Sequence, residues 1–244
     1  MTFSEKIKNR YSVRDFDPNK KLTEDEEKQI LDAIASAPTS SNWHSSSAIV
    51  VKDQVVLNRL SKIHPKAKQL ENCGMLIVFL ADYNRMNIAL KEFPEYKYNS
   101  HDSETYTVAV GDAFIQATTA QAMAIELGLG TCFLGLVRVG VNEIIDALNI
   151  KGQAFPVIGL SIGHKKSEGL VKPKLNRIYK EKYNIEQIND EVAKYNVVLK
   201  DFFAKYAQNT TTPLTYTEAM AKIASGYNMN SKEIEEIWGL ELKK

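Results

Sequence analysis

The chain has 244 residues, 44% of them hydrophobic, and its 31 Lys and Arg residues are balanced by 30 Asp and Glu. This length can bury a large core, either as one domain or as a domain with an appendage. The balanced charge excludes the strong positive field that holds a polyanion, so nucleic acid is not an expected partner.

No targeting or membrane segment is evident in the sequence. The first ten residues, MTFSEKIKNR, contain no apolar run behind a basic segment. The longest apolar stretches, such as Met75 to Ala81, are far shorter than the roughly 20 residues of a membrane-spanning helix. Cys73 and Cys132 lie far apart and outside any CxxC motif, so no disulfide framework or zinc site is indicated. We expect a cytoplasmic protein with two reduced core thiols and no membrane partner.

The sequence predicts one capped helix near the start and four buried strands along the chain. The helix, Leu22 to Ala37, has Thr23 and Glu26 at the spacing of a capping box. Apolar, partly β-branched runs predict strands that form one sheet, two before and two after the middle of the chain. These runs are Ala48 to Val51, Met75 to Leu80, Thr131 to Leu136 and Phe155 to Ile162.

Helical patterns dominate the rest of the chain. A long Ala-rich helix is predicted from Val108 to Leu127, with Gly128 at its C-terminal cap. Its small side chains indicate a closely packed central helix. The remaining predicted segments are a short helix at Asn142 to Leu148, a charged loop at Lys165 to Lys174, helices at Asn189 to Tyr206 and Thr217 to Trp238, and a polar surface loop at Asn209 to Thr215.

The sequence GLSIG, with Gly159, Ser161 and Gly163, matches the GxSxG pattern of a hydrolase nucleophile. A nucleophile elbow leads from a strand into a helix, but a loop of Lys, Gly and Pro follows here. The histidine of such a triad lies downstream, whereas His164 is the last histidine in the chain. Ser161 is therefore predicted to be an ordinary strand residue.

Two further ligand motifs are also unsupported. Gly128, Gly130 and Gly135 lack the GxGxxG spacing of a dinucleotide-binding loop and follow a predicted helix instead of a strand. The four histidines show no HExxH or comparable spacing, so no dedicated metal site is expected.

Two polar stretches are candidates for a ligand site. Arg10, Ser12 and Arg14 alternate in RYSVR, so an extended backbone would project them from one side, where a phosphate or carboxylate can dock. The sequence APTSSNWHSSS, residues 37–47, carries six hydroxyl side chains and an amide directly after a predicted helix. Taken alone, the first is better interpreted as a solvated basic stretch, and the second can be a plain loop.

Together these stretches resemble the FMN-dependent nitroreductase family, in which R-x-S-x-R/K and A-P-S-S-x-N segments hold FMN. The sequence ELGLGTCFLGLVR, Glu126 to Arg138, is similar to the family's helix that ends in G-L-G and runs into a strand beside the flavin. KPKL resembles the family's phosphate-binding K-P-R-L. LADYNR, which ends at Arg85, and the helices beyond residue 189 resemble the type A branch of oxygen-insensitive NADPH nitroreductases and NADPH-flavin oxidoreductases.

This resemblance implies an α+β fold with a mostly antiparallel central sheet, flanking helices and a C-terminal helical extension. Residues 1–164 would form the FMN-binding core, and residues 165–244 the phosphate loop and helical extension of the same domain. It also implies a homodimer with FMN at the subunit interface, for which Val108 to Leu127 is the candidate interface helix.

The resemblance also assigns roles in FMN binding, with no catalytic residue and no metal ligand. Arg14 would stabilise negative charge near flavin N1 and O2, and the backbone N–H of Gly135 would lie near N5. Three cations and a hydroxyl would hold the phosphate, namely Arg10, Lys172, Lys174 and Ser12. Polar ring and ribityl contacts would come from Ser40, Ser41, Asn42 and Gln69, and the wall of the ring from Phe133 and Leu134. The predicted set is completed by Tyr11, Pro38, Thr39, Leu136 and Arg138.

The activity implied is a ping-pong transfer of hydride from NADPH or NADH to FMN, and then of two electrons to a nitroaromatic, a quinone or free flavin. Type A relatives have basic residues in the loop that corresponds to Asn209 to Thr215. This loop has none, so the coenzyme preference stays open. Other flavin chemistry on the same scaffold and a non-catalytic FMN-binding sensor are the alternatives.

Overall fold

The computed structural model describes residues 1–206, 214–226 and 231–239. The chain divides into two compact units. The first comprises Met1–Gly169 and Met229–Lys244, and the second comprises Leu170–Asn228. Within the described residues, no helix combines the length and apolar character that crossing a membrane requires.

The first unit is built on one four-stranded sheet. In chain order its strands are β1 (Ser46–Val51), β2 (Met75–Asp82), β3 (Gly130–Leu134) and β4 (Ala154–Gly163). Their order across the sheet is β1-β2-β4-β3, and every neighbouring pair is antiparallel. The four apolar runs therefore form one antiparallel sheet, as predicted.

The prediction that the third strand continues to Leu136 is wrong. β3 ends at Leu134, opposite Gly159 of β4, and the chain turns into the 3₁₀ helix η4 (Gly135–Arg138). β4 has a bulge at Val157, where its pairing with β2 shifts by one residue, close to the point where β3 ends.

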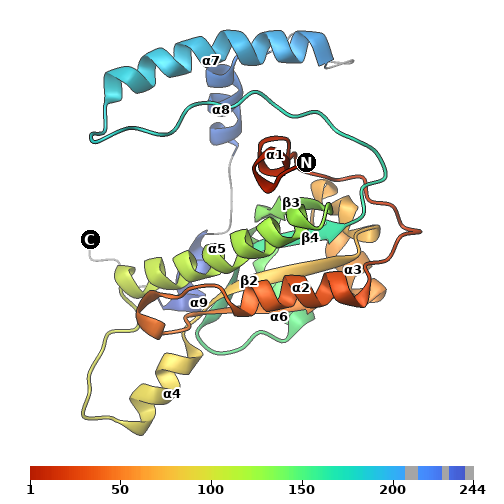
Figure 1. Ribbon diagram of the computed structural model, residues 1–244. Helices are drawn as coiled ribbons and strands as arrows, with labels where there is room; N and C mark the ends of the chain where they lie inside the picture. Colours follow the sequence, from red (N-terminus) through yellow and green to blue (C-terminus); the bar gives the residue numbers. More distant parts are fainter. Residues whose placement is uncertain (207–213, 227–230, 240–244) are drawn as a thin grey trace. The chain divides into compact units, whose positions relative to one another are not determined.

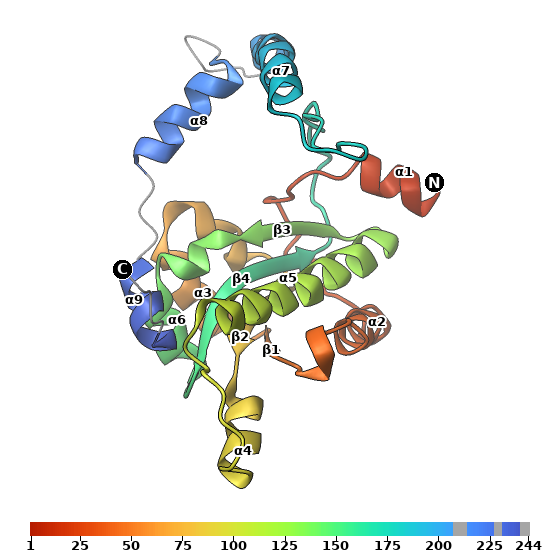
Figure 2. The same ribbon diagram turned by 90° about the vertical axis from the view of Figure 1, so that its left-hand side faces the viewer.

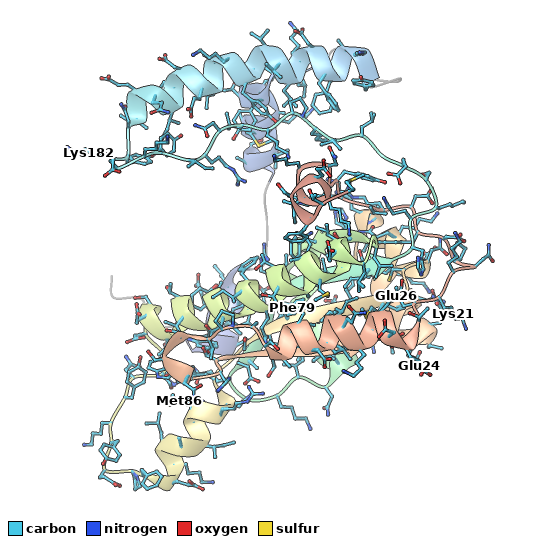
Figure 3. All side chains as sticks on the ribbon, viewed as in Figure 1. Lys21, Glu24, Glu26, Phe79, Met86 and Lys182 are labelled. Carbon is cyan, nitrogen blue, oxygen red and sulfur yellow. The ribbon has the colours of Figure 1, made fainter. Side chains whose placement is uncertain are left out.

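The central strand β2 is buried on both faces, which explains its uninterrupted apolar sequence. Met75, Ile77 and Phe79 contribute to one core cluster, whereas Leu76 and Val78 contribute to another on the opposite face. Figure 3 shows Phe79 at the sheet, while Glu24, on a covering helix, points outward. The period-two alternation thus divides the strand between two cores.

Helices cover both faces of the sheet (Figures 1 and 2). α2 (Glu24–Ala35) and α5 (Ser103–Glu126) pack on the face that carries Phe79. The other face is covered by α3 (Gln54–Leu60), α6 (Val141–Leu148) and the 3₁₀ segments η2 (Ser61–Ile63) and η3 (Pro65–Glu71). The first unit is therefore a sheet between two helical layers, as the predicted α+β fold requires.

Two further helices lie outside these layers. α1 (Phe3–Lys8) begins with a capping box between Thr2 and Glu5 and buries none of its residues. α4 (Asn84–Glu92) also has no buried residue, and it projects from the rest of the first unit in both views (Figures 1 and 2).

The helix predicted at Leu22 to Ala37 is confirmed as α2. The Thr23 side chain accepts a hydrogen bond from the Glu26 amide at 3.2 Å, and the Thr23 amide donates to the Glu26 carboxylate at 2.8 Å. This reciprocal pair satisfies two amides that the first turn leaves without helical partners, so the sequence signal has a direct structural cause.

The Ala-rich helix α5 packs closely on the sheet through a stripe of fully buried alanines, Ala109, Ala113, Ala117, Ala120 and Ala124. It begins at Ser103, earlier than the predicted Val108, because Asp102 caps it through the Thr105 amide at 2.8 Å. It ends as predicted: Gly128 has φ of +80°, and the Leu129 amide donates back to the Ala124 carbonyl at 2.9 Å.

The described residues of the C-terminal region form three helices instead of the two predicted. α7 (Ile185–Tyr206) and α8 (Tyr216–Ser225) belong to the second unit, and α9 (Ser231–Trp238) belongs to the first. The single helix predicted from Thr217 to Trp238 is wrong because α8 ends at the cap residue Gly226, a poor helix former. Residues 209–213 of the predicted surface loop lie outside the described residues.

The last helix is fixed to the core of the first unit by Trp238, which is completely buried. Its ring packs edge-on against Tyr83, Tyr106 and Phe155, and its carbonyl accepts a hydrogen bond from Gln153 Nε2 at 3.3 Å. The end of the described chain is thus part of the first hydrophobic core. The functional division into residues 1–164 and 165–244 stays a prediction.

Trp238→Ala should destabilise the protein by about 3–5 kcal/mol, because it leaves a large cavity among three aromatic rings. The free energy of unfolding, measured by urea denaturation, checks this. Ile223→Ala, at an exposed position of α8, is the control and should change stability by less than about 0.5 kcal/mol. Equal effects of the two substitutions would contradict the packing of α9 described above.

Candidate functional site

The basic stretch near the N-terminus, residues 10–14, is extended, and backbone hydrogen bonds join this part of the chain to the end of the sheet. The Val13 amide donates to the Thr131 carbonyl of β3 at 2.9 Å, and the Asp17 amide donates to the His164 carbonyl at the same distance. Val13 is buried, whereas Arg10, Ser12 and Arg14 are exposed. The alternation in the sequence therefore presents the two arginines and the serine away from the core.

Part of this stretch converges on Cys132 in β3. Burial raises the pKa of the Cys132 thiol, while the nearby Arg14 charge and a hydrogen bond with Ser12 act in the opposite direction. Gln69, itself buried in η3, points its amide nitrogen at Cys132 Sγ from 3.9 Å. Ser12, Arg14 and Gln69, which are widely separated in sequence, are therefore gathered around one residue of β3.

The glycine that follows β3 lies under an arginine. A side chain at Gly135 would meet Arg138 Nη2 at 3.3 Å, and the next nearest atoms also belong to the Arg138 guanidinium. Arg138 Nη1 donates to the Val157 carbonyl, where β4 bulges and the ladder with β2 shifts. Arg138 thus satisfies a backbone carbonyl at the bulge and crosses above Gly135.

The neighbouring apolar residues differ in exposure. Phe133 is half-buried and packs against the core on the α5 side of the sheet. Leu134 is only 4% exposed and packs in the opposite core, with Leu136 partly buried beside it. Their assignment to the wall of the flavin ring stays a prediction.

The hydroxyl-rich stretch forms a tight turn with strained backbone. Ser41, Asn42 and His44 all have positive φ, at 47°, 59° and 51°. Non-glycine residues rarely adopt this left-handed conformation, which costs of order 1–3 kcal/mol each and persists only where neighbouring contacts impose it. Ser40, Ser41 and Asn42 are exposed. The turn therefore holds polar side chains toward solvent at an energetic cost.

The contacts that hold this turn come from Asp112 in the middle of α5. Its carboxylate accepts hydrogen bonds from the Thr39 hydroxyl, from the Ser40 amide at 3.0 Å, and from the Ser45 hydroxyl and amide at 2.7 and 3.3 Å. Asp112 is 2% exposed. The buried Asp112 side chain thus fixes the turn at both ends, through Thr39 and Ser40 at the start and Ser45 at the finish.

The sequence analysis missed Asp112, although a signal was present. It is the one charged residue between positions 105 and 125, in a segment otherwise rich in Ala and other small or apolar residues. A charge within a buried helix requires partners, and a hydroxyl-rich loop elsewhere in the chain can supply them. Pairing these two anomalies would have identified the anchor.

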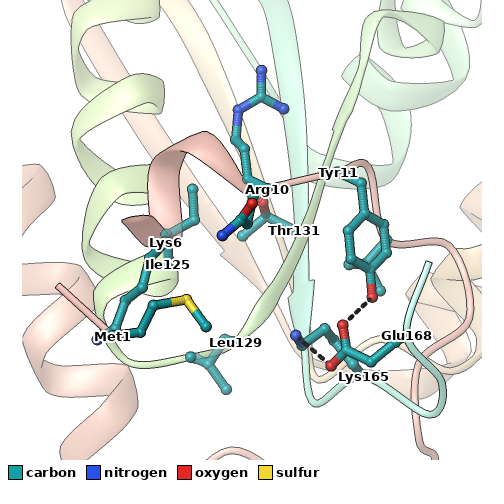
Figure 4. Close-up of a pocket in the computed structure, with 12 residues that line it drawn as sticks. Met1, Lys6, Arg10, Tyr11, Ile125, Leu129, Thr131, Lys165 and Glu168 are labelled. Carbon is teal, nitrogen blue, oxygen red and sulfur yellow. Dashed lines mark hydrogen bonds and ion pairs between the residues drawn. The ribbon is translucent and has the colours of Figure 1, made fainter. Parts of the chain in front are cut away.

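Tyr11 occupies a different surface from Arg14. Its hydroxyl contacts the Ser167 carbonyl at 3.1 Å and the Glu168 carboxylate at 3.2 Å, and Lys165 pairs with the same carboxylate at 2.9 Å. Tyr11, Lys165 and Glu168 border a cavity of about 330 Å³ beside the C-terminal end of α5. In Figure 4, Arg10 extends from the rim of this cavity away from its apolar floor.

The KPK segment belongs to the second unit, where α7 supports it. Tyr195 donates its hydroxyl hydrogen to the Pro173 carbonyl at 2.9 Å, and Lys172 Nζ lies 5.5 Å from the centre of the Phe203 ring. The backbone between Lys172 and Lys174 is therefore fixed by α7. That these two lysines and Arg10 share one phosphate stays a prediction.

The GLSIG serine has no catalytic setting. Ser161 lies within β4, is fully buried and donates a hydrogen bond to the Cys132 carbonyl at 3.2 Å. Its prediction as an ordinary strand residue is confirmed. In the part of the chain that the structure describes, no group of three or more His, Cys, Asp or Glu side chains is arranged to hold a metal ion.

Comparison with known proteins identifies the class to which this fold and site belong. A profile of the nitroreductase family matches residues 7–164, more than half of the chain. The chain therefore belongs to the nitroreductase family and is an oxidoreductase, which confirms the family predicted from the motifs.

Several relatives match nearly the whole chain. An FMN reductase [NAD(P)H] of Bacillus subtilis is 28% identical over 222 residues, which cover 88% of this chain and 89% of the relative. An NADPH-dependent oxidoreductase of Staphylococcus aureus is 29% identical over 205 residues, 81% of each chain. The structure of NfrA1 from B. megaterium is similar with a TM-score of 0.88 and 28% identity over 98% of both chains.

The fold likeness extends to more distant structures. An NADPH:FMN oxidoreductase of Vibrio harveyi, solved in complex with NAD+, has a TM-score of 0.82 and 20% identity over 99% of both chains. At this identity the comparison shows the fold alone. The helices beyond residue 164 are thus shared with relatives, although the family profile ends there.

Both thiols should be inert in the folded protein. Burial raises the pKa of Cys73 to about 12 from its ordinary 9.0, so the unfolded chain ionises first and stability falls as the pH rises above about 9. By pH 10 the wild type should lose about 1.4 kcal/mol relative to Cys73→Ala, measured by urea denaturation. Rapid reaction of native protein with Ellman's reagent at pH 8 would contradict the burial of both thiols.

Proposed function

We propose that this protein binds FMN and uses NADPH or NADH to reduce small flat acceptors such as nitroaromatics, quinones or free flavin. The observation that carries the proposal is the exposed presentation of Ser12 and Arg14 beside β3 by a backbone pinned at Val13. The names of the Bacillus and Staphylococcus relatives support the coenzyme and the FMN chemistry.

The residues present suit FMN in charge and shape. The ligand combines a phosphate, a polar ribityl chain and a planar ring. Arg10, Ser12 and Arg14 offer cationic and hydroxyl donors from exposed positions of one short segment. The space above Gly135 is bordered by a long, flexible arginine side chain instead of backbone, so a ring can approach the Gly135 amide if Arg138 shifts.

When bound, FMN supplies the hydride chemistry, accepting two electrons from a nicotinamide and passing them on. The protein's part is to bind, orient and tune. Arg14 would stabilise negative charge on the ring edge at N1 and O2, while Arg10, Lys172 and Lys174 would neutralise the phosphate. The substitution of Lys174 for the family's Arg keeps the charge and loses bidentate geometry.

The acceptor would use the same exposed face as the nicotinamide, so the two substrates would bind in turn. A homodimer with α5 at the interface is part of the proposal. Two large apolar side chains on the outer side of α5, Phe114 and Ile115, are about 40% exposed within this chain, at 41% and 38%. An interface there would cover them.

The decisive test is anaerobic mixing of the purified, FMN-loaded protein with NADPH and with NADH in turn. Bleaching of the flavin absorbance, followed by its return on addition of a nitroaromatic or quinone, is expected. The ratio of the two bleaching rates gives the coenzyme preference. FMN that stays oxidised with both nicotinamides would indicate a sensor or other flavin chemistry, and failure to bind FMN would refute the proposal.

Arg14→Ala should retain FMN but slow its reduction by about 10²–10³-fold, because a fixed positive charge near the ring edge is lost while the phosphate ligands remain. Stopped-flow single-turnover reduction by the preferred nicotinamide measures this. Arg59→Ala is the control, because Arg59 is an exposed arginine that pairs with Asp146 in the first unit, and it should not change the rate. An unchanged rate in Arg14→Ala would refute the role of Arg14.

A further inference from the structure

The buried carboxylate of Asp112 is not explained by the fold alone. Its two oxygens receive four hydrogen bonds, from two backbone amides and two hydroxyls, all in residues 39–45. Within the described part of the chain, no Lys, Arg or His forms an ion pair with it. All four partners are donors, so they satisfy the acceptor oxygens of the carboxyl group. Burying a polar side chain that has no ionic partner is nevertheless costly, and apolar residues would fill the space more cheaply.

The turn that Asp112 holds is also costly. Three of the four residues from Ser41 to His44 have left-handed backbone without being glycine, and such strain persists only where the surroundings impose it. A plain connection between α2 and β1 could place glycine at these positions. The combination of a strained, exposed polar turn with a buried carboxyl anchor is typical of a binding loop that is organised before its ligand arrives.

The turn has an inner and an outer set of polar groups. The Thr39 hydroxyl donates to Asp112 and accepts from the His44 amide at 3.0 Å, so both of its functions are used within the turn. The Ser45 hydroxyl is buried against Asp112. The side chains of Ser41 and Asn42 are exposed, and among the described residues they have no hydrogen-bond partner. The inner groups therefore fix the backbone, and the outer groups remain available to a ligand.

We propose that Asp112 is a positioning residue for FMN: through Thr39, Ser40 and Ser45 it fixes the backbone that presents Ser41 and Asn42 to the ribityl chain and ring edge. This inference rests on the proposed function. It assigns Thr39 to the anchor instead of to direct cofactor contact. Asp112 itself touches neither cofactor nor substrate, so its effect is on FMN affinity and on the order of the turn.

The test compares FMN dissociation constants of apoproteins, measured by quenching of flavin fluorescence. Asp112→Asn replaces an acceptor with an amide that faces backbone N–H groups, and Thr39→Val removes the hydroxyl. Each should raise the dissociation constant at least about tenfold, as loss of a supporting hydrogen bond around a ligand shell commonly does. Thr39→Ser, which keeps the hydroxyl, should restore wild-type affinity. The variant that combines Asp112→Asn and Thr39→Val should have a dissociation constant no higher than that of whichever single variant binds FMN less tightly. Both substitutions act through the same turn, so their effects should not add.

Asp82→Asn is the matched control. Asp82 is another buried carboxylate in the first unit, hydrogen-bonded by the Ser47 hydroxyl at 2.6 Å and the Asn84 amide at 3.0 Å. It should lower stability without changing FMN affinity. Hydrogen exchange of the Ser40 and Ser45 amides, which donate to Asp112, should accelerate in Asp112→Asn and not in Asp82→Asn.

The outcomes separate the two proposals. A wild-type protein that fails to bind FMN overturns the proposed function and this inference with it. If the wild type binds FMN, and Thr39→Val binds it equally well although the turn amides exchange faster, the inference is overturned and the proposed function stands. Should Asp112→Asn not fold, the Thr39→Val and Thr39→Ser pair decides alone.

Discussion

The close approach of α5 to the antiparallel sheet is the constraint on which the first unit depends. It is made possible by the alanine stripe, because side chains of this size let the helix backbone lie near Phe79 and its neighbours. The opposite face of β2 is covered as well, so the sheet is buried on both sides. The exposed candidate site residues of this unit therefore lie outside the sheet, in the N-terminal stretch with Arg14 and in the turn with Ser41, and the half-buried Arg138 lies in η4.

The bulge in β4 shows how an irregularity in the sheet shapes the site. Pro156 cannot donate to a ladder, and the register shifts by one residue beside it, leaving the Val157 carbonyl available to Arg138. This contact draws η4 back over the end of the sheet, with Gly135 beneath the guanidinium. A proline within a central strand thus leaves one carbonyl outside the strand pairing. The bond from Arg138 to that carbonyl helps to set the course of the chain after β3, where the flavin ring is predicted to bind.

The sequence predicted those features that depend on local patterns. The Thr23 capping box, the Gly128 cap and the four apolar runs each have a period or spacing that can be read without tertiary contacts. The predictions of where elements end are wrong where a tertiary contact or a single cap residue sets the end. The third strand stops early beside a bulge, and the last helix divides at Gly226. Neither the pairing of Asp112 with residue 39 nor that of Gln69 with residue 132 leaves a periodic signal, because each joins segments more than sixty residues apart.

The two polar segments of the candidate site share one arrangement. Some groups of each segment bond to the protein interior and fix the backbone, and neighbouring side chains are exposed to solvent. In the N-terminal stretch, Val13 is buried and its amide is bound to β3, so the flanking Ser12 and Arg14 are displayed. In the turn, Thr39 and Ser45 bond to Asp112, and Ser41 is displayed. Rigid presentation reduces the conformational entropy lost on binding and so raises the affinity for a ligand. Family motifs identify the displayed residues, whereas the residues that hold them are visible only in the folded chain.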